Sequence, residues 1–408
     1  VNTSPVATAP TRRPFFSAFA LIRMGFFGRS PLLPVVTHDD GSQSDPLLVA
    51  TTEEAVAAAA ALRFPPGFIF GSATSAYQVE GGIVDTNWNR WEQQKTKRGG
   101  GETIRNGEEA GRACDMWNLF EDVDLPLIEK LGLGSFRFSI EWSRVEPTEG
   151  VFDDAALARY ERWCTLLRAR GIEPCVTLLH FTEPGWFVDQ GGWEEKRNVP
   201  LFVRFCERVV RRLSPFCSMW CTLNEPVGCA INGWLVGIHP PGGQGQLRTT
   251  VRVIWHMLLG HREVSRAIRE AAAPGIASTS DARQRSLTSG AGGASGAAGA
   301  AGASGAGAAP CIMIANNIVW FEAKWRWNFV ARLVTQLVNL AFNYCVMDLC
   351  VRGRLSLFLD LVCCLFGARE EMRSLEGSVT HIGVNNYARV QLGMCGCCFG
   401  CGGGKRRL

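Results

Sequence analysis

Short apolar segments alternate with longer helical patterns over residues 63–273, and this alternation constrains the fold more than any other feature of the chain. Four segments are short and rich in β-branched and aromatic residues, as strands are: 68–71, 135–139, 174–179 and 219–223. Stretches such as 155–170 and 199–213 instead place apolar residues three and four apart, the spacing of a helix packed on one face. Strand, helix and strand in repetition predict an α/β fold with a parallel sheet.

The strand pattern resumes after an unusual segment, residues 289–309, which consists only of Gly, Ala and Ser. Such a segment has no side chains to bury, so we predict a flexible low-complexity insertion that loops out of the fold. Residues 311–320 and 379–385 then have the composition of two further strands.

The two ends of the chain differ in composition from its body. Residues 1–62 contain no Asp or Glu before Asp39 and are rich in Ser, Thr, Ala, Pro and Arg. We expect a disordered leader there, either an organelle transit peptide or a leader without an address, which leaves cytoplasm and plastid open as compartments. The tail, residues 393–408, is rich in Cys and Gly. Its cysteines lack the paired spacing and the His of a zinc site, so we expect no metal.

Composition and charge exclude several classes of protein. With 47% hydrophobic and 20% charged residues, the chain can bury a large core. The net charge is only +4, and no basic run is interleaved with aromatic residues, so we expect no nucleic-acid partner. The most apolar stretch, residues 340–368, is interrupted by four charged residues, which predicts core helix and no membrane span. Most of the 16 cysteines lie in apolar runs and are expected to be buried thiols.

Polar residues directly follow two of the predicted strands. His180 follows 174–179, and Asn224-Glu225-Pro226 follows 219–223. In parallel α/β folds the carboxyl ends of strands are where functional side chains gather. A carboxyl group there can act as a proton donor, although a helix cap is an equally valid interpretation of Asn-Glu-Pro taken alone.

Four motifs along the chain carry a family resemblance. They are Phe64-Pro-Pro-Gly-Phe-Ile-Phe-Gly-Ser-Ala-Thr-Ser-Ala-Tyr-Gln-Val-Glu-Gly-Gly82, Phe136-Arg-Phe-Ser-Ile-Glu-Trp-Ser-Arg-Val-Glu-Pro147, Thr222-Leu-Asn-Glu-Pro226 and His381-Ile-Gly-Val-Asn-Asn-Tyr387. In this order they closely resemble glycoside hydrolase family 1, the β-glucosidase family. The resemblance implies a (β/α)8 TIM barrel, with about six of its eight strands in residues 63–392, and a retaining glycosidase that needs no cofactor and acts on small or oligosaccharide β-glycosides.

The resemblance also implies roles for individual residues. Glu225 matches the general acid/base, Arg137 matches an arginine beside the nucleophile, and Tyr387 matches a tyrosine that orients the nucleophile's carboxylate. Four residues match sugar-binding positions: Gln78, His180, Asn224 and Asn385. Without the family, Gln78 would be an ordinary loop residue, His180 a satisfied strand-end histidine and Tyr387 a packing aromatic. Trp142 and Trp186 match family tryptophans that we interpret as mostly structural.

A second carboxylate is the missing part of this mechanism. A retaining enzyme needs one about 5 to 5.5 Å from the acid, and the resemblance implies that it lies in an Ile/Val-x-Glu-Asn-Gly segment on strand seven. No Glu-Asn-Gly occurs in the sequence, and Glu183, Glu194 and Glu370 do not match the nucleophile's position. A barrel with six strands cannot close, so we expect unpaired edges on its first and sixth strands and retaining turnover to be nearly abolished.

The sequence therefore predicts a β-glucosidase-like retaining glycosidase whose chain lacks the strand that carries the nucleophile. Two alternatives stay open. A transglycosidase would use the same residues and pass the sugar to an acceptor other than water. A catalytically inactive sugar-binding protein would keep the binding residues alone. The sequence does not indicate an oligomeric state.

Overall fold

The computed structural model describes residues 64–94, 103–272, 309–325, 327–354, 369–395 and 398–400. The expected leader at residues 1–62, nearly all of the insertion at 289–309 and much of the tail lie outside these described residues. The chain divides into two compact units, Val1–Phe68 and Ile69–Leu408. In the first, residues 64–68 form a turn in which the backbone N–H of Phe68 donates to the carbonyl of Pro65 (3.1 Å). The helices and strands discussed below all belong to the second unit.

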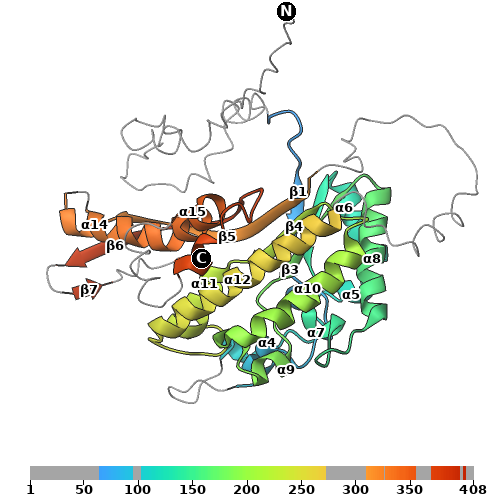
Figure 1. The fold of residues 1–408 in the computed structure, drawn as a ribbon, viewed down its shortest axis with the longest axis horizontal. Coiled ribbons are helices and arrows are strands. Elements are labelled where there is room, and N and C mark those ends of the chain that lie inside the picture. Colours follow the sequence, from blue (N-terminus) through green and yellow to red (C-terminus); the bar gives the residue numbers. More distant parts are fainter. Residues whose placement is uncertain are drawn as a thin grey trace, which may run out of the picture. The chain divides into compact units, whose positions relative to one another are not determined.

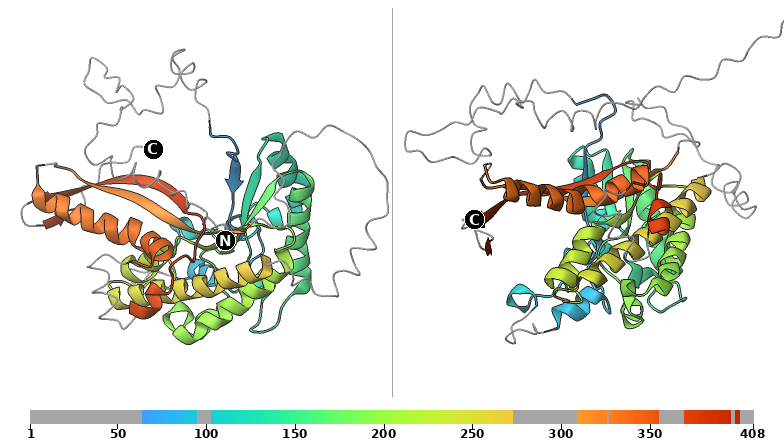
Figure 2. Two further views of the ribbon diagram at one scale, coloured as in Figure 1. Left: turned by 45° about the horizontal axis from the view of Figure 1, so that its top comes forward. Right: turned by 60° about the vertical axis from the view of Figure 1, so that its left-hand side comes forward.

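The second unit is built on one sheet of seven strands that follow one another in chain order. Strands β1 to β6 pair in parallel, and the short β7 is antiparallel to β6. The strands are β1 (Gly71–Ala73), β2 (Ser135–Ser139), β3 (Glu173–Leu179), β4 (Met219–Asn224), β5 (Cys311–Ala323), β6 (Gly383–Cys395) and β7 (Cys398–Gly400). Figures 1 and 2 show the parallel strands curling as part of a barrel does.

Helices connect the strands and cover the outer face of the sheet. The α-helices are α3 (Ala76–Val79), α4 (Asn87–Glu92), α5 (Met116–Leu119), α6 (Leu125–Lys130), α7 (Trp142–Val145), α8 (Asp154–Ala169), α9 (Gly185–Asp189), α10 (Val199–Leu213), α11 (Pro226–Ala230), α12 (Leu247–Ala272), α14 (Phe329–Asn339), α15 (Cys345–Arg352) and α17 (Arg369–Arg373). Shorter helical turns are η2 (Arg105–Gly107), η3 (Phe120–Asp124), η4 (Gly192–Glu194), η5 (Lys196–Asn198), η6 (Ile231–Val236) and η7 (Leu340–Tyr344). Figure 1 shows α8, α10 and α12 running alongside one another over the sheet.

The predicted strand and helix pattern is confirmed in the middle of the chain and shifted at its ends. β2 has the bounds expected from the sequence, and β3, β4, α8 and α10 agree with it within a residue. β1 begins at Gly71, after the apolar run expected to form it, because pairing with β2 starts only at Gly71 and Ser135. β6 begins at Gly383 and runs on to Cys395, since it continues to pair with β5 as far as Leu392.

Both edges of the parallel sheet are open within the described part of the chain. β1 pairs only with β2, and β6 pairs only with β5 and, at its far end, with β7. The six parallel strands therefore form part of a (β/α)8 barrel and do not close it, as expected.

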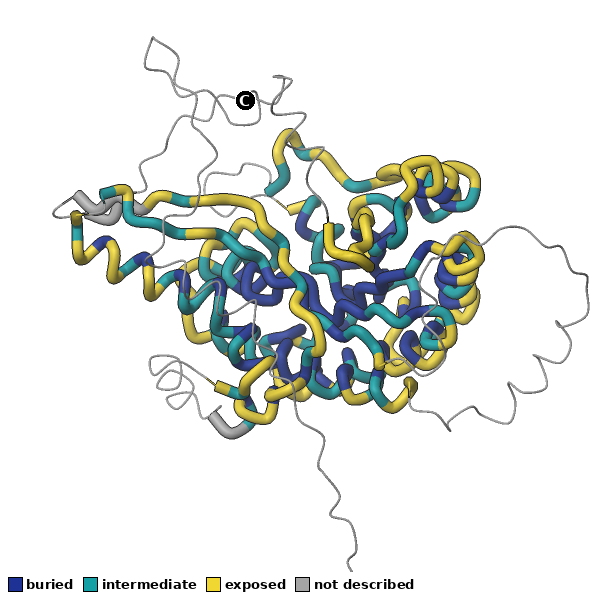
Figure 3. The backbone as a smooth tube through the Cα atoms, turned by 90° about the horizontal axis from the view of Figure 1, so that it is seen from above, coloured by how far each residue is buried: buried dark blue, intermediate teal, exposed yellow. Residues whose placement is uncertain are grey.

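The core lies between the sheet and the outer helices, and Figure 3 shows the strands at its centre as buried. Helix α8 begins after Asp153, whose side chain accepts hydrogen bonds from the backbone N–H groups of Ala155 and Ala156. Its apolar face buries Tyr160 and Trp163 against aromatic residues of β2. Such aromatic pairs bury large areas and fix the helix on the sheet.

One described helical stretch, Phe329–Arg352, has a length and composition that would allow it to cross a membrane. It comprises α14, η7 and α15 and overlaps the segment in which the sequence predicts core helix. Its second half behaves as core helix, because Val346, Met347, Leu349 and Cys350 are buried.

Candidate active site

Glu225 stands at the junction between β4 and α11, at the carboxyl end of the sheet. Its backbone is left-handed (φ +48°), so the chain turns sharply between the strand and the helix. Its N–H donates to the carbonyl of Ala315 on β5 (2.7 Å), which ties the turn to the neighbouring strand. The residue is only 6% exposed. The carboxyl group is therefore held in one place by the sheet.

Three neutral side chains donate hydrogen bonds to the Glu225 carboxylate. Oε1 accepts from Asn385 Nδ2 (2.7 Å) and from the Tyr387 hydroxyl (2.5 Å), and Oε2 accepts from Asn317 Nδ2 (3.0 Å). Within the described residues no cation forms an ion pair with it. The carboxylate is thus oriented by hydrogen bonds from β5 and β6.

A bulge in β6 directs Tyr387 towards Glu225. Ile318 of β5 pairs with Asn386, and the next residue, Val319, pairs with Ala388, so Tyr387 is the extra residue between two regular pairs. Bulges re-aim side chains in this way and are common next to active sites. Desolvation of its hydroxyl, and then the nearby Glu225 carboxylate, raise the pKa of Tyr387 to about 12, so the hydroxyl stays a donor at neutral pH. The sequence assigns this hydroxyl to a nucleophile's carboxylate, whereas among the described residues it binds Glu225.

Asn224 and Arg137 form a second part of the site, next to Glu225. Asn224 Oδ1 accepts from Arg137 Nη2 (2.7 Å) and from Asn385 Nδ2 (3.1 Å). The Arg137 guanidinium also donates to the Thr177 hydroxyl (2.7 Å) and to Cys221 Sγ (3.3 Å). No carboxylate of the described residues pairs with this guanidinium. The Asn224 oxygen is fixed by two donors, and its amide nitrogen, which makes no hydrogen bond to the described residues, can donate to a ligand.

His180 lies at the carboxyl end of β3. Its Nδ1 is buried and has no hydrogen-bond partner in the described part of the chain. Burial, reinforced by the charge of Arg137, lowers the pKa of His180 to about 3. The ring is therefore neutral at physiological pH and offers one donor and one acceptor to a bound molecule.

Gln78 lies in α3, just after β1, and its side chain is exposed. Its Oε1 accepts a hydrogen bond from the buried Ser75 hydroxyl (2.8 Å), which leaves its amide nitrogen available. Gln78 and His180 thus follow β1 and β3, and Asn224 is the last residue of β4, all at the same end of a parallel sheet.

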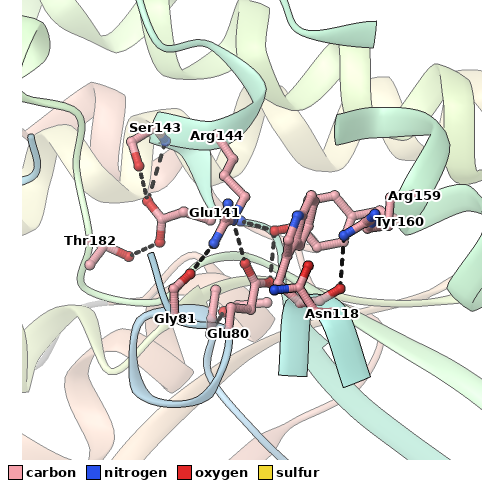
Figure 4. Close-up of polar contacts among 12 residues, drawn as sticks. Glu80, Gly81, Asn118, Glu141, Ser143, Arg144, Arg159, Tyr160 and Thr182 are labelled. Carbon is pink, nitrogen blue, oxygen red and sulfur yellow. Dashed lines mark hydrogen bonds and ion pairs between the residues drawn. The ribbon is translucent and has the colours of Figure 1, made fainter. Parts of the chain in front are cut away.

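A buried polar network, shown in Figure 4, supports the loops that carry Gln78 and His180. Glu80 accepts from Arg144 Nε (2.9 Å) and from the Tyr160 hydroxyl (2.8 Å). Burial raises the pKa of Glu80 to about 7, although the Arg144 charge opposes the shift. Glu141 accepts from the Thr182 hydroxyl (2.9 Å), two residues beyond His180. The network therefore joins the segments after β1, β2 and β3.

Two residues near Glu225 were not singled out in the sequence. Asn317 donates to Glu225 from within β5, and the only signal for it was a pair of polar residues, Asn316-Asn317, inside an apolar strand. The His239 ring lies 5.0 Å from the Trp88 ring. It also lies 6.0 Å from the ring of Phe181, the residue after His180. Burial lowers the pKa of His239, and the Glu225 charge opposes that shift.

Two other acidic residues considered from the sequence, Glu183 and Glu194, make no hydrogen bond to this cluster within the described residues. Glu194 accepts from the Trp234 indole (2.7 Å) and has a structural role. Burial raises the pKa of Glu183 to about 8, and the indole of Trp193 only partly offsets the shift. The side chain of Glu370 and those of the tail cysteines lie outside the described residues. In the parts that are described, no group of His, Cys, Asp and Glu could hold a metal ion.

The chain is similar to a known family and to curated proteins. The sequence model of Glycosyl hydrolase family 1 matches residues 60–285, more than half of the chain. Beta-glucosidase A of Acetivibrio thermocellus is 34% identical over 215 residues, which are 51% of this chain and 46% of that protein. Lactase/phlorizin hydrolase of Homo sapiens is 32% identical over 204 residues, 48% of this chain and 10% of that protein. The chain thus spans less than half of the length of these relatives.

Solved structures show the same fold over a longer part of the chain. A family 1 β-glucosidase from Thermotoga maritima superposes with a TM-score of 0.66 at 24% identity, covering 83% of this chain and 68% of the other. An enzyme from Alicyclobacillus herbarius gives a TM-score of 0.67 and covers 83% and 70% of the two chains. The likeness thus covers a larger share of the chain than the segment that the family model matches.

Proposed function

Because this chain belongs to glycosyl hydrolase family 1, we propose that the cluster around Glu225 is the acid/base half of a β-glucosidase-like retaining site. Glu225 would protonate the leaving oxygen of a β-glycoside and later deprotonate the attacking water. The observation that carries this proposal is the position of the carboxyl group: it is fixed by Asn317, Asn385 and Tyr387 at the carboxyl end of the sheet. In (β/α)8 barrels this end holds the active site.

We propose that Gln78, His180 and Asn224 bind the hydroxyl groups of the sugar. Each of them has at least one polar atom that makes no hydrogen bond to the described residues. A sugar ring carries alternating donors and acceptors, which a neutral His and two amides can match. Asn385 would act indirectly, because it bridges Asn224 and Glu225.

The second carboxylate required for retention would come from outside the described residues, as the absence of a Glu-Asn-Gly segment in the sequence suggests. Arg137 supports this view. Its guanidinium binds a hydroxyl, a thiol and an amide within the described residues, and a nearby carboxylate would balance its charge. Retaining turnover by these 408 residues alone is expected to be very slow.

The two alternatives follow from the same cluster. A transglycosidase would differ only in the acceptor that takes the sugar, and product analysis with added cellobiose would identify it. A non-catalytic sugar-binding protein would use Gln78, His180 and Asn224 without a nucleophile.

For the rest of the chain, we propose a leader at residues 1–62, an insertion at 289–309 and a tail at 393–408 around a barrel at 63–392.

The test supplies the missing nucleophile from solution. The 408-residue chain is incubated with phenyl β-glucoside and sodium azide. Azide would attack the anomeric carbon from the α face as the bond to the phenoxy oxygen breaks, and Glu225 would transfer its proton to the departing oxygen. The expected product is α-glucosyl azide. Glu225→Gln should slow its formation by about 10² with phenyl β-glucoside, and far less with dinitrophenyl β-glucoside, whose leaving group needs no proton.

The outcomes separate the alternatives. Product formation that depends on Glu225 only with the poor leaving group supports the acid/base role. Binding of glucose or cellobiose without any product, measured by titration calorimetry, supports the sugar-binding protein. Absence of both binding and product contradicts the proposed site. Glu195→Gln, an exposed change outside the cluster, is the matched control.

A further inference from the structure

Helix α14 packs on the sheet with its polar side inwards. Its buried residues are Ala331, Thr335 and Asn339, four apart along one face. Asn343, in the next turn of η7, continues this buried stripe. A helix that covers a sheet usually buries its apolar stripe. In α14 the small and polar residues take that place.

The two asparagines of this stripe bind the backbone of β5. Asn339 accepts from the N–H of Phe321 (3.0 Å) and donates to its carbonyl (2.7 Å). Asn343 does the same with Val319, at 3.1 and 2.8 Å. Since β4 pairs with β5 only as far as Ala315, these side chains occupy the positions that a neighbouring strand would fill. The polar stripe is therefore required to satisfy β5.

The apolar residues of α14 consequently face outwards. Val330, Leu333 and Leu337 are 53%, 45% and 44% exposed, and Phe329 and Trp327 at the start of the helix are 73% and 81% exposed. Spacings of three and four residues place Phe329, Val330, Leu333 and Leu337 on one side of the helix, Trp327 precedes it, and the exposed segments along α14 are visible in Figure 3. We call these five residues the α14 outer face.

Charge around the α14 outer face has one sign. Between Glu322 and Asp348 the sequence contains Lys324, Arg326 and Arg332 and no Asp or Glu. Lys324 and Arg332 are exposed. Glu322, at the border of this stretch, forms an ion pair with Arg389 of β6.

We propose that the α14 outer face docks on an anionic lipid surface, with the helix lying in the plane of the interface. An exposed apolar stripe with Trp and Phe at one end and cations beside it is the pattern of interfacial helices. Tryptophan favours the headgroup level of a bilayer, and each cation near an anionic surface adds to the attraction.

Two other uses of this face fit the structure less well. A membrane-crossing helix would have to give up the four hydrogen bonds between its asparagines and β5, and the second half of the Phe329–Arg352 stretch is already buried in the protein. A second copy of the chain docked on the same face would bring Lys324 and Arg332 against their own counterparts, which is unfavourable.

The experiment measures binding of the 408-residue chain to vesicles by co-sedimentation. Vesicles of phosphatidylcholine with about one third phosphatidylserine are compared with vesicles of phosphatidylcholine alone. We expect the chain to bind the anionic vesicles more tightly, and we expect this preference to shrink as salt screens the charges.

Two variants of the α14 outer face make the test specific. Leu333→Asp with Leu337→Asp removes its apolar centre, and Lys324→Glu with Arg332→Glu reverses its charge. Each double variant should lower the partition onto anionic vesicles by about tenfold or more. All four side chains are exposed, so circular dichroism should show the wild-type fold.

The controls make the same changes elsewhere. Leu127→Asp with Leu131→Asp alters two leucines of the α6 region that are 51% and 70% exposed. Arg211→Glu with Arg248→Glu reverses two exposed cations. Both controls should bind as the wild type does.

Three results would overturn the proposal: no binding to anionic vesicles, equal loss of binding in face variants and controls, or self-association without lipid that Leu333→Asp with Leu337→Asp abolishes. The last result would identify a second copy of the chain as the partner.

Discussion

The Tyr387 hydroxyl lies 2.5 Å from Glu225 Oε1, although Tyr387 belongs to β6, Glu225 follows β4, and β5 lies between these two strands. A bulge makes this contact, because Tyr387 is the extra residue between the pairs Ile318–Asn386 and Val319–Ala388. The acid/base candidate is thus oriented by a residue that a regular strand would have pointed elsewhere.

Tyr387→Phe should destabilise the chain while leaving its fold intact. The change removes a hydrogen bond to a carboxylate, and because Tyr387 is 66% exposed we expect a loss of about 1 kcal/mol in the free energy of unfolding in urea. Tyr344→Phe is the matched control, since the Tyr344 hydroxyl makes no hydrogen bond to the described residues. Equal effects of the two changes would contradict the importance of the bond.

Replacing Asn317 should slow the azide reaction and hardly change the stability of the chain. Its amide nitrogen binds Glu225, whereas its buried Oδ1 has no hydrogen-bond partner among the described residues. Asn317→Leu loses one bond and also removes a costly unsatisfied oxygen, so we expect the free energy of unfolding to change by less than about 1 kcal/mol.

The same change should slow the azide reaction with phenyl β-glucoside, because Glu225 would lose one of its three orienting donors. The exposed neighbour variant Asn386→Ala should leave both quantities unchanged. A large loss of stability with normal azide chemistry in Asn317→Leu would show that Asn317 has a purely structural role.

Asn317 also shows how far the sequence alone can predict the site. Gln78, His180, Asn224 and Glu225 lie at or just after the carboxyl ends of strands, so the parallel α/β pattern and the family motifs locate them together. Asn317 lies inside β5, which continues past the point where β4 stops pairing with it. A rule that looks for functional residues after strands does not find a residue within one.

The register of a strand is a further feature that the sequence alone does not predict. The contact between Tyr387 and Glu225 depends on one extra residue in β6, and side-chain alternation alone does not show where a bulge falls. For the same reason the sequence predicts strand 379–385, whereas β6 extends from Gly383 to Cys395. Its bounds are set by pairing with β5 and not by the local composition.

The asparagines that bind the backbone of β5 should be essential to the stability of the α14 region. Asn343→Leu would leave the N–H and the carbonyl of Val319 without their partners. We expect a loss of about 2 kcal/mol in the free energy of unfolding, with faster amide exchange in β5. Gln336→Leu, on the exposed side of α14, adds apolar area without breaking a bond and is the control. An unchanged exchange rate at Val319 in Asn343→Leu would contradict this role.

Glu183 should make the chain less stable as pH rises from about 4.5 to about 8. Burial raises its pKa from 4.5 to about 8 in the folded chain, so across this window the folded state holds a proton that the unfolded state has released. Stability therefore falls with rising pH, and Glu80, whose pKa is raised to about 7, contributes in the same direction. Glu183→Gln removes the Glu183 contribution. We compare the free energies of unfolding of Glu183→Gln and the wild type, measured in urea. Their difference should shift by more than about 1 kcal/mol in favour of the variant between pH 5 and pH 8. The exposed change Glu195→Gln should keep the wild-type slope, and parallel curves for all three proteins would show that Glu183 ionises in the folded state as it does in the unfolded one.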